Sequence, residues 1–319
     1  MDEMALKLTP SGLFRRWLVP AGIIVLILFA FFFPRLMDKQ NIWNLFFLVC
    51  LHISMGQSWN ILAGFAGQTS LGHAAFFGIG AFITRTLWFD GIPFAAAFII
   101  GGLAAVAFAM LIGAPTFRLR GAYFAIGTLG VAEVLRITVS QNLPFISTMS
   151  GPLIAAYDLS VRYYLALGLA LTTTAAAYLL LRSRWSLGIL ALREDEGAAQ
   201  ATGVHVLRHK LLALALSSLF AGLAGGVFAF QQISYYHEAP FSPLWTFDAL
   251  LITFIGGLGT LAGPVIGAIF FILVREQLAL NLGEVHQAIF GILFILIVLA
   301  FPGGLVEAWE RIRKSFKRK

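Results

Sequence analysis

The sequence is poor in charge, in cysteine and in nucleotide-binding motifs. Only 12% of its 319 residues are charged, about half the share found in soluble globular domains. Cys50 is the only cysteine, which excludes an internal disulfide and a cysteine-based metal cluster. No G-x-x-x-x-G-K-[ST] sequence is present, so the chain carries no P-loop, and any ATP that drives its activity must be hydrolysed by a partner. We therefore expect a chain that is not an enzyme and binds no cofactor of its own.

Long apolar runs are what the sequence has instead. Hydrophobic residues make up 59% of the chain and the mean hydropathy is +0.87, so a water-soluble fold could not cover its own surface. About 20 apolar residues cross a bilayer as a helix, and a backbone in lipid must satisfy its own hydrogen bonds. A membrane barrel would instead show short alternating strands. The pattern predicts an all-α membrane protein, a polytopic bundle of about ten transmembrane segments (eight to ten), over residues 17–34, 42–63, 73–89, 93–114, 121–141, 161–181, 209–234, 245–256, 264–281 and 285–301.

The placement of basic residues predicts the topology. Most lysines and arginines fall in five clusters, at 7–16, 118–120, 182–193, 208–210 and 311–319. With about ten crossings all five clusters lie on one face, which the positive-inside rule assigns to the cytoplasm. We therefore expect both termini in the cytoplasm, with an N-terminal segment over 1–16, a membrane domain over 17–304 and a basic tail over 305–319. This arrangement, with the tail on an anionic leaflet, explains the net charge of +7 without nucleic-acid binding.

Two glycine-rich stretches, at 64–72 and 256–264, interrupt the apolar pattern and share the sequence G-x-x-[ST]-L. Glycine lets the backbone leave helical geometry, and non-helical backbone at membrane depth must be buried or face water. We therefore expect broken segments there. The first would line a translocation path, through Gly67, Gln68, Thr69, Ser70, Gly72 and His73. The alternative is close helix packing through small residues, which is frequent in membranes. His73 is expected to be a helix-end hydrogen-bonding residue, since no second ligand lies nearby at metal-binding spacing.

The loop 182–210 is long and charged, and it separates two predicted membrane helices. Helix propensity and a glycine stop signal predict a short helix over 194–201, ended near Gly203. This helix presents small alanines between charges as a compact knob, which we interpret as a docking site for a separate motor protein. The alternative is a solvated connecting loop.

The same loop carries a family resemblance. Ala198, Ala199 and Gly203 resemble the alanine-alanine-x-x-x-glycine of the loop by which ABC importer permeases engage their ATPase subunits. The family commonly has glutamate directly before the two alanines, whereas here Gly197 holds that place and Glu196 lies one residue earlier. Four blocks, in the family's order, resemble the LivM-type permeases of branched-chain amino acid ABC transporters: GFAGQTSLGHAAFFGIGAF (64–82), LRGAYFAIGTLGVAEVLR (119–136), REDEGAAQATGVHVLRHKLLALALSSLFAGLAGGVFA (193–229) and LLITFIGGLGTLAGPVIGA (250–268).

The resemblance implies a transport subunit with several partners. A second, LivH-like permease subunit would complete a heterodimer in the cytoplasmic (inner) membrane of a bacterium. Two cytoplasmic ATP-binding subunits would hydrolyse ATP, an extracytoplasmic binding protein would deliver the solute, and membrane lipids would surround the pair. Alternating access would then move branched-chain or related small amino acids into the cytoplasm. The residues that would engage the ATPases are Arg193, Glu194, Asp195, Glu196, Ala198, Ala199 and Gly203.

Ionisable residues within the predicted membrane helices are a second group of candidates. Glu133 and Arg136 are three residues apart, which places them on one helix face, and a charge at the bilayer centre must be paired or lie in a wet cavity. They are either an element of the path or gate, or a structural ion pair near the extracytoplasmic end. Asp248, Arg275 and Glu276 have the same two interpretations, while Arg85 could snorkel to the membrane interface and is assigned no role.

Three alternatives stay open at this point. An ion- or proton-coupled secondary carrier would place ionisable groups near the bilayer midplane. A polytopic membrane enzyme would need His, Asp or Glu clustered at one face, whereas the six histidines are scattered. A permease of the same family could instead carry urea or short amides, because the run STMSGPL at 147–153 departs from the family's threonine-glycine-glycine run.

Overall fold

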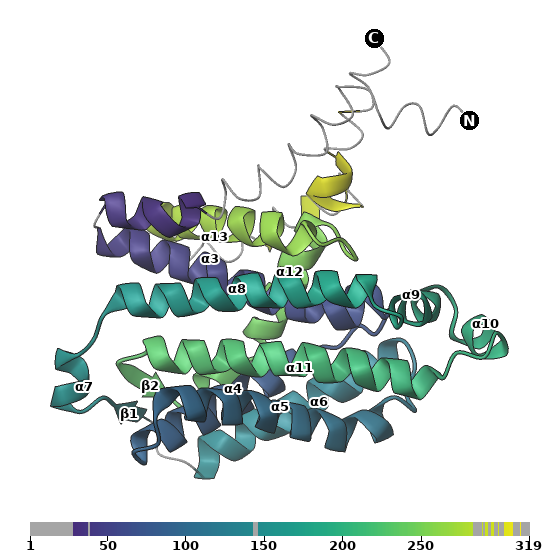
Figure 1. Cartoon of the computed structure of the whole chain (residues 1–319), viewed down its shortest axis with the longest axis horizontal. Helices are drawn as coiled ribbons and strands as arrows, with labels where there is room; N and C mark the ends of the chain where they lie inside the picture. Colours follow the sequence, from purple (N-terminus) through teal and green to yellow (C-terminus); the bar gives the residue numbers. More distant parts are fainter. Residues whose placement is uncertain are drawn as a thin grey trace. The chain divides into compact units, whose positions relative to one another are not determined.

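The computed structural model describes residues 28–37, 39–142, 146–282 and 303–308, together with isolated positions between 289 and 313. Its long helices are α3 (Gln40–Trp59), α4 (His73–Phe89), α5 (Phe94–Thr116), α6 (Ala122–Asn142), α8 (Leu159–Arg182), α11 (Val206–Gln231), α12 (Leu244–Gly256) and α13 (Gly263–Leu282). A π-helix, η2 (Asn60–Phe65), continues α3. Shorter helices connect the long ones along the chain: α7 (Gly151–Ala155), α9 (Ser186–Glu194), α10 (Glu196–Ala201) and η3 (Ala239–Phe241). Figure 1 shows α7 at one end of α8, and α9 and α10 at its other end.

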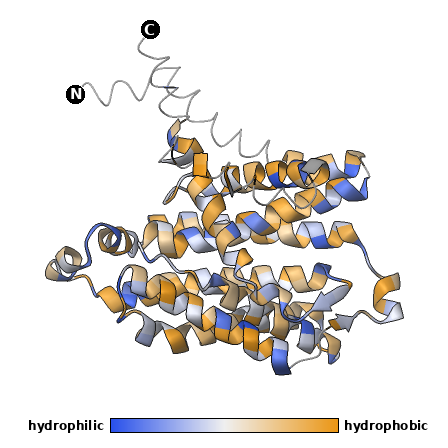
Figure 2. Ribbon diagram, turned by 180° about the vertical axis from the view of Figure 1, so that it is seen from behind, coloured by the Kyte–Doolittle hydropathy of each residue, from blue (hydrophilic) through white to orange (hydrophobic). Residues whose placement is uncertain are grey.

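The predicted class, an all-α membrane protein, is confirmed. Among the residues that the structure describes, six helices are long and apolar enough to cross a membrane: Gln40–Phe65, Phe94–Thr116, Ala122–Asn142, Leu159–Arg182, Val206–Gln231 and Gly263–Leu280. Hydrophobic residues predominate on the long helices, with hydrophilic residues among them, while the connection between α9 and α10 is hydrophilic (Figure 2). Leu28–Met37 and α12 are apolar but shorter, and α4 has 17 residues. The count of about ten crossings therefore stays a prediction, and the segments 1–16, most of 285–301 and most of the basic tail lie outside the described residues.

The chain forms two compact units, residues 1–46 and 47–319. In the described part of the first unit, the helix Leu28–Met37 stacks the rings of Phe29 and Phe33, with their centroids 4.6 Å apart. The second unit holds both glycine-rich stretches and the charged loop, and all the sites described below belong to it.

The core of the second unit is the packing of α4, α5 and α11 against one another. At Gly80 of α4, a Cβ would overlap the backbone of Gly222 in α11, and at Gly225 it would overlap the carbonyl of Phe77 in α4. Small residues let helix backbones approach this closely, which matters in lipid because no hydrophobic effect drives helices together there. These glycines are therefore packing residues, fixed by the contact between two helix backbones.

We expect Gly225→Leu to prevent the bundle from forming, because the added side chain meets backbone that has no rotamer to change. Overpacking of a core costs about 1–3 kcal/mol even where side chains can shift. The measurement is the monodisperse fraction and apparent Tm of the detergent-purified protein. Gly168→Leu in α8 is the matched control, since nothing lies within 4 Å of a Cβ at that exposed position. Equal stability of the two variants would contradict this packing.

A short antiparallel sheet departs from the all-helical prediction. Strand β1 (Ile146–Thr148) pairs with β2 (Ser234–Tyr236) beside the end of α11. Arg85 of α4 is only 1% exposed at this place, so its side chain does not reach solvent as snorkelling would require. Its guanidinium donates to the carbonyls of Ala229, Gln232, Ser147 and Ile233. Because two of these carbonyls belong to the end of α11, the cation neutralises the negative end of that helix from inside the protein.

Candidate functional site

The first glycine-rich stretch leaves helical geometry, as the sequence predicts. The π-helix η2 ends at Phe65, and the chain is non-helical until α4 begins at His73. Gly67 has a φ of +70°, a conformation that side-chain-bearing residues rarely adopt. A Cβ at this position would lie 2.9 Å from the Cα of Arg193 in α9. Glycine is therefore required both by the turn and by the close approach of the charged loop.

The second glycine-rich stretch lies against the first and is joined to it by Asn60. The Asn60 side chain donates to the Thr260 carbonyl at 2.9 Å and accepts from the Gly259 backbone N–H at 2.9 Å. Gln57, one turn earlier, donates to the Leu261 carbonyl at 2.7 Å. These bonds satisfy backbone groups that no helix can satisfy, which is the condition for irregular backbone inside a membrane protein. The two broken segments therefore form one structure.

Arg193 connects that structure to the charged loop. Its Nη1 donates to the Gly64 carbonyl at 3.0 Å, and a Cβ at Gly259 would overlap the same guanidinium group. A single side chain of α9 thus lies against both glycine-rich stretches. The sequence predicted these three features separately, and the structure brings them together.

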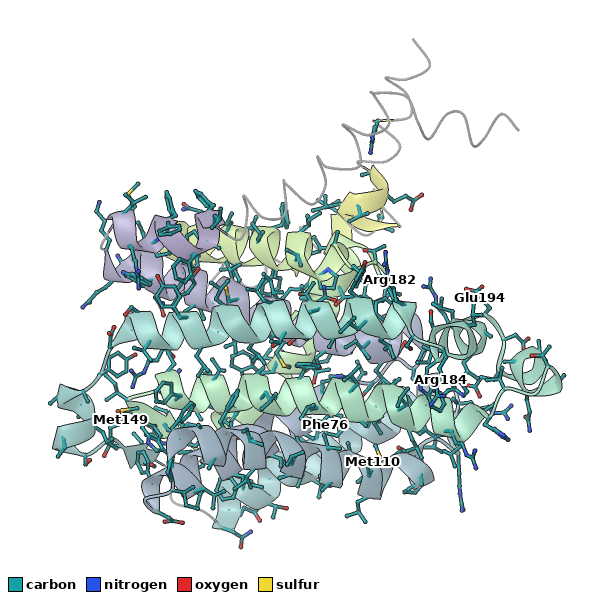
Figure 3. All side chains as sticks on the ribbon, viewed as in Figure 1. Phe76, Met110, Met149, Arg182, Arg184 and Glu194 are labelled. Carbon is teal, nitrogen blue, oxygen red and sulfur yellow. The ribbon has the colours of Figure 1, made fainter. Side chains whose placement is uncertain are left out.

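The charged loop contains two helices with a break at Asp195. The prediction of one helix over 194–201 is wrong in its start, because Glu194 ends α9 and α10 begins at Glu196. Asp195 is the N-cap, and its Oδ1 accepts from the Ala198 N–H at 2.9 Å, as short polar residues do at helix starts. Gly203, with a φ of +90°, follows the end of α10, as predicted. Figure 3 shows Glu194 at the same end of the unit as Arg182 and Arg184, and Met149 at the opposite end.

Glu196 points inward from the start of α10. Its carboxylate forms an ion pair with Lys210 of α11 and accepts from the Gln68 side chain at 3.0 Å. The Lys210 side chain is only 2% exposed, whereas that of Glu194 is 82% exposed. A buried ammonium is tolerated only when it is paired. Glu196 therefore ties α10 both to α11 and to the first glycine-rich stretch.

The remaining residues proposed for the path differ in their exposure. Thr69 is exposed, while Ser70 is buried and its hydroxyl accepts from the Gly72 N–H at 3.1 Å. A Cβ at Gly72 would overlap the carbonyl of Thr128 in α6. His73 is fully buried at the start of α4, and its Nε2 lies 2.7 Å from the Ser217 hydroxyl of α11. A role of these residues in the path stays a prediction.

Glu133 and Arg136 lie in the second half of α6, beyond the start of that helix. Arg136 Nε donates to Glu133 at 2.9 Å, and its Nη1 forms an ion pair with Glu238, just before η3. All three line an open pocket of about 460 Å³. Glu238 was missed from the sequence because it lies in a predicted loop about 100 residues away. The arginine thus joins α6 to the turn between β2 and η3.

Asp248 and Arg275, the other ionisable pair, also meet. Arg275 Nη1 donates to Asp248 Oδ2 at 2.9 Å, and His52 Nε2 lies 3.5 Å from the same oxygen. The His52 Nδ1 bonds to the Leu48 carbonyl at 2.8 Å. His52 was not a candidate from the sequence, because a lone histidine in an apolar run carries no signal of its own.

The six apolar spans and the glycine-broken centre define a multi-pass helical membrane protein. The profile of the family described as "Branched-chain amino acid transport system / permease component" matches residues 41–298, so the chain belongs to this family of transport permeases. No solved structure matches the chain at a significant level.

Relatives of known name agree with this assignment. The chain is 29% identical to the "High-affinity branched-chain amino acid transport system permease protein LivM" of Escherichia coli (strain K12), over 89% of this chain and 74% of that protein. It is 23% identical to the "Probable branched-chain amino acid transport permease protein LivM" of Methanocaldococcus jannaschii, over 64% of this chain and 66% of that protein. A shorter match, 31% identical over 45% of the chain, is to the "Autoinducer 2 import system permease protein LsrC" of Klebsiella pneumoniae, covering 43% of that protein.

Proposed function

We propose that this chain is a permease subunit of an ABC importer that moves branched-chain amino acids into the bacterial cytoplasm. The observation that carries the proposal is the convergence at Arg193 and Glu196. These two residues of the charged loop contact the first glycine-rich stretch through Gly64, Gly67 and Gln68. A loop that only connected two helices would not require such contacts.

In this proposal the charged loop transmits force from partner ATPases. Ala198 and Glu194 are exposed and offer the docking surface, while Ala199 is 3% exposed and anchors α10. Movement of α9 and α10 would displace Arg193 and Glu196, and with them the backbone of both glycine-rich stretches. That displacement would open and close the path in an alternating-access cycle, since irregular backbone at a helix break can change conformation without unwinding whole helices.

The topology follows from the same proposal. The ends of the helices near α9 and α10 carry the basic clusters at 118–120, 182–193 and 208–210, and the positive-inside rule supports a cytoplasmic position for this end. Both termini then lie in the cytoplasm and the chain crosses the inner membrane about ten times. The pocket at Glu133, Arg136 and Glu238 would face the opposite side, where a substrate-binding protein would dock and a distinct, LivH-like permease subunit would complete the path.

ATP-dependent uptake tests the proposal. The chain would be co-expressed with its second permease and ATPase subunits and reconstituted in liposomes with the binding protein outside. We expect accumulation of labelled leucine only with ATP at the ATPase face, and none with a proton gradient alone. Uptake driven by the gradient without ATP would identify an ion-coupled carrier and overturn the proposal. Competition by urea or acetamide, but not by valine or isoleucine, would identify a permease of this family for short amides.

A further inference from the structure

A pocket of about 590 Å³ lies where three candidate spans end beside the charged loop. Its lining comes from residues between the end of α5 and the start of α6, from α10 and the turn after it, and from the start of α11 at Val206. The residues 117–120 that join α5 to α6 form one wall, and the turn after α10 forms another. The pocket thus opens at the level where the chain leaves the hydrocarbon region.

The pocket is strongly basic. Arg118, Arg120 and Arg208 line it with exposed side chains, and the buried Lys210 lies at its base. Its single acidic residue, Glu196, is already bound to Lys210 and Gln68. Within the residues that the structure describes, no side-chain hydrogen bond or ion pair engages any of the three arginines. Three guanidinium groups gathered without a partner are a site for an anion, and their paired N–H donors match the oxygens of a phosphate.

Two further features fit a phosphate that carries hydrocarbon. The first turn of α11 lines the pocket through Val206, Leu207 and Arg208, and α11 has neither a side-chain cap nor an acidic residue in that turn. Its unsatisfied N–H groups add to the attraction for a negative charge. Phe117, Val206 and Leu207 line the same pocket as the arginines, so its lining combines apolar and charged side chains. A free inorganic ion would have no use for that apolar surface.

We propose that this pocket binds the phosphate headgroup of an anionic phospholipid. Basic pockets between membrane helices bind such headgroups, whereas zwitterionic lipids lack the net charge. Gln200 and Gly203 of the charged loop line the same pocket, so a bound headgroup would touch the element proposed to dock the ATPases. The lipid site does not depend on which solute is carried.

Native mass spectrometry of the detergent-purified permease tests the site. Three probes are titrated separately, namely phosphatidylglycerol, phosphatidylcholine and inorganic phosphate. We expect saturable binding of phosphatidylglycerol and much weaker binding of phosphatidylcholine. Arg118→Gln/Arg120→Gln should weaken phosphatidylglycerol binding about 30-fold, from the contribution of two basic residues at a lipid headgroup. Arg208→Gln, on a different element, should weaken it about fivefold.

Arg182→Gln/Arg184→Gln is the matched control. It removes the same charge from the same end of the unit, and neither arginine lines the pocket. We expect phosphatidylglycerol binding to this control to equal that of the wild-type protein, with an unchanged Tm in all variants. Equal weakening by both double variants would show adsorption to general positive charge and overturn the proposal. Displacement of the lipid by millimolar inorganic phosphate would identify a site for a free anion, which also overturns it.

Discussion

Replacing Glu196 with alanine is expected to destabilise the permease by about 3–5 kcal/mol, because it leaves the Lys210 ammonium buried without a partner. The Lys210 side chain is 2% exposed, and Glu196 is the only acidic residue paired with it in the described part of the chain. The same substitution also removes the acceptor of the Gln68 amide. The measurement is the apparent Tm of the purified permease in detergent, where the loss should appear as a large downward shift.

Two further variants separate this effect from a general sensitivity of the loop. Glu194→Ala removes a neighbouring carboxylate that is 82% exposed and 3.9 Å from Arg193, and an exposed pair of this kind contributes about 0–1 kcal/mol. Glu196→Ala/Lys210→Met removes both buried charges, and it should recover most of the lost stability. If Glu196→Ala were as stable as Glu194→Ala, the buried ion pair would not be holding α10 in place.

The double variant also separates stability from transport. A well-folded Glu196→Ala/Lys210→Met protein would still lack the bond between α10 and Gln68. In the proposed mechanism this bond helps to carry the movement of the loop to the first glycine-rich stretch. The double variant should therefore hydrolyse ATP in complex with its partners but accumulate little leucine per ATP consumed.

A feature of this molecule can be predicted from the sequence when it is determined by residues close together in the chain. The long helices begin and end within about three residues of the predicted segments, such as 121–141 against Ala122–Asn142 and 264–281 against Gly263–Leu282. Hydrophobic runs and the residues that interrupt them are local signals, and a helix in lipid satisfies its own backbone. The helix at 194–201 needed one correction, because Glu194 still belongs to α9 and the chain breaks at Asp195, which caps α10.

Contacts between distant segments could not be predicted in this way. Arg193 and Gly64 are 129 residues apart in the chain. Arg193 belongs to a run of charged residues and Gly64 to a run of glycines, and neither pattern indicates the other. Arg85 is a second case in which a local signal does not indicate the contact that the fold provides. Hydropathy alone allows a long cation near a helix end to reach for water, but the end of α11, the residue that follows it and strand β1 together offer Arg85 four carbonyl acceptors inside the protein.

The three acidic residues of the charged loop differ in their contacts and in their exposure. Glu196 is turned inward to Lys210, and Asp195 is occupied as the cap of α10. Glu194 is the one whose carboxylate is exposed to a partner. The displaced glutamate of the sequence motif is therefore a structural link within the permease, and under the proposed function Glu194 would be the residue that makes the acidic contact with an ATPase.

Gly67→Ala is expected to reduce transport by about tenfold or more while leaving the complex assembled. The added Cβ would lie 2.9 Å from the Arg193 Cα, in a residue whose φ is +70°. The strain of a left-handed residue is about 1–3 kcal/mol. If this strain is present only in the conformation in which Arg193 lies against Gly67, it changes the ratio of the two conformations of the transport cycle by about tenfold or more. Uptake of labelled leucine per assembled complex is the measurement.

Two other glycines separate the contact from the backbone strain. Gly91 has a φ of +92° but nothing within 4 Å of a Cβ, and Gly168 has open space and helical geometry. Gly91→Ala should therefore lower stability by about 1–3 kcal/mol with normal uptake per complex, and Gly168→Ala should change neither. If Gly67→Ala behaved like Gly91→Ala, the contact with Arg193 would have no part in transport. If only Gly67→Ala loses uptake, the transport cycle requires the close approach of the charged loop to the first glycine-rich stretch. Backbone strain alone would not explain that result, because strain of the same size at Gly91 leaves transport unchanged.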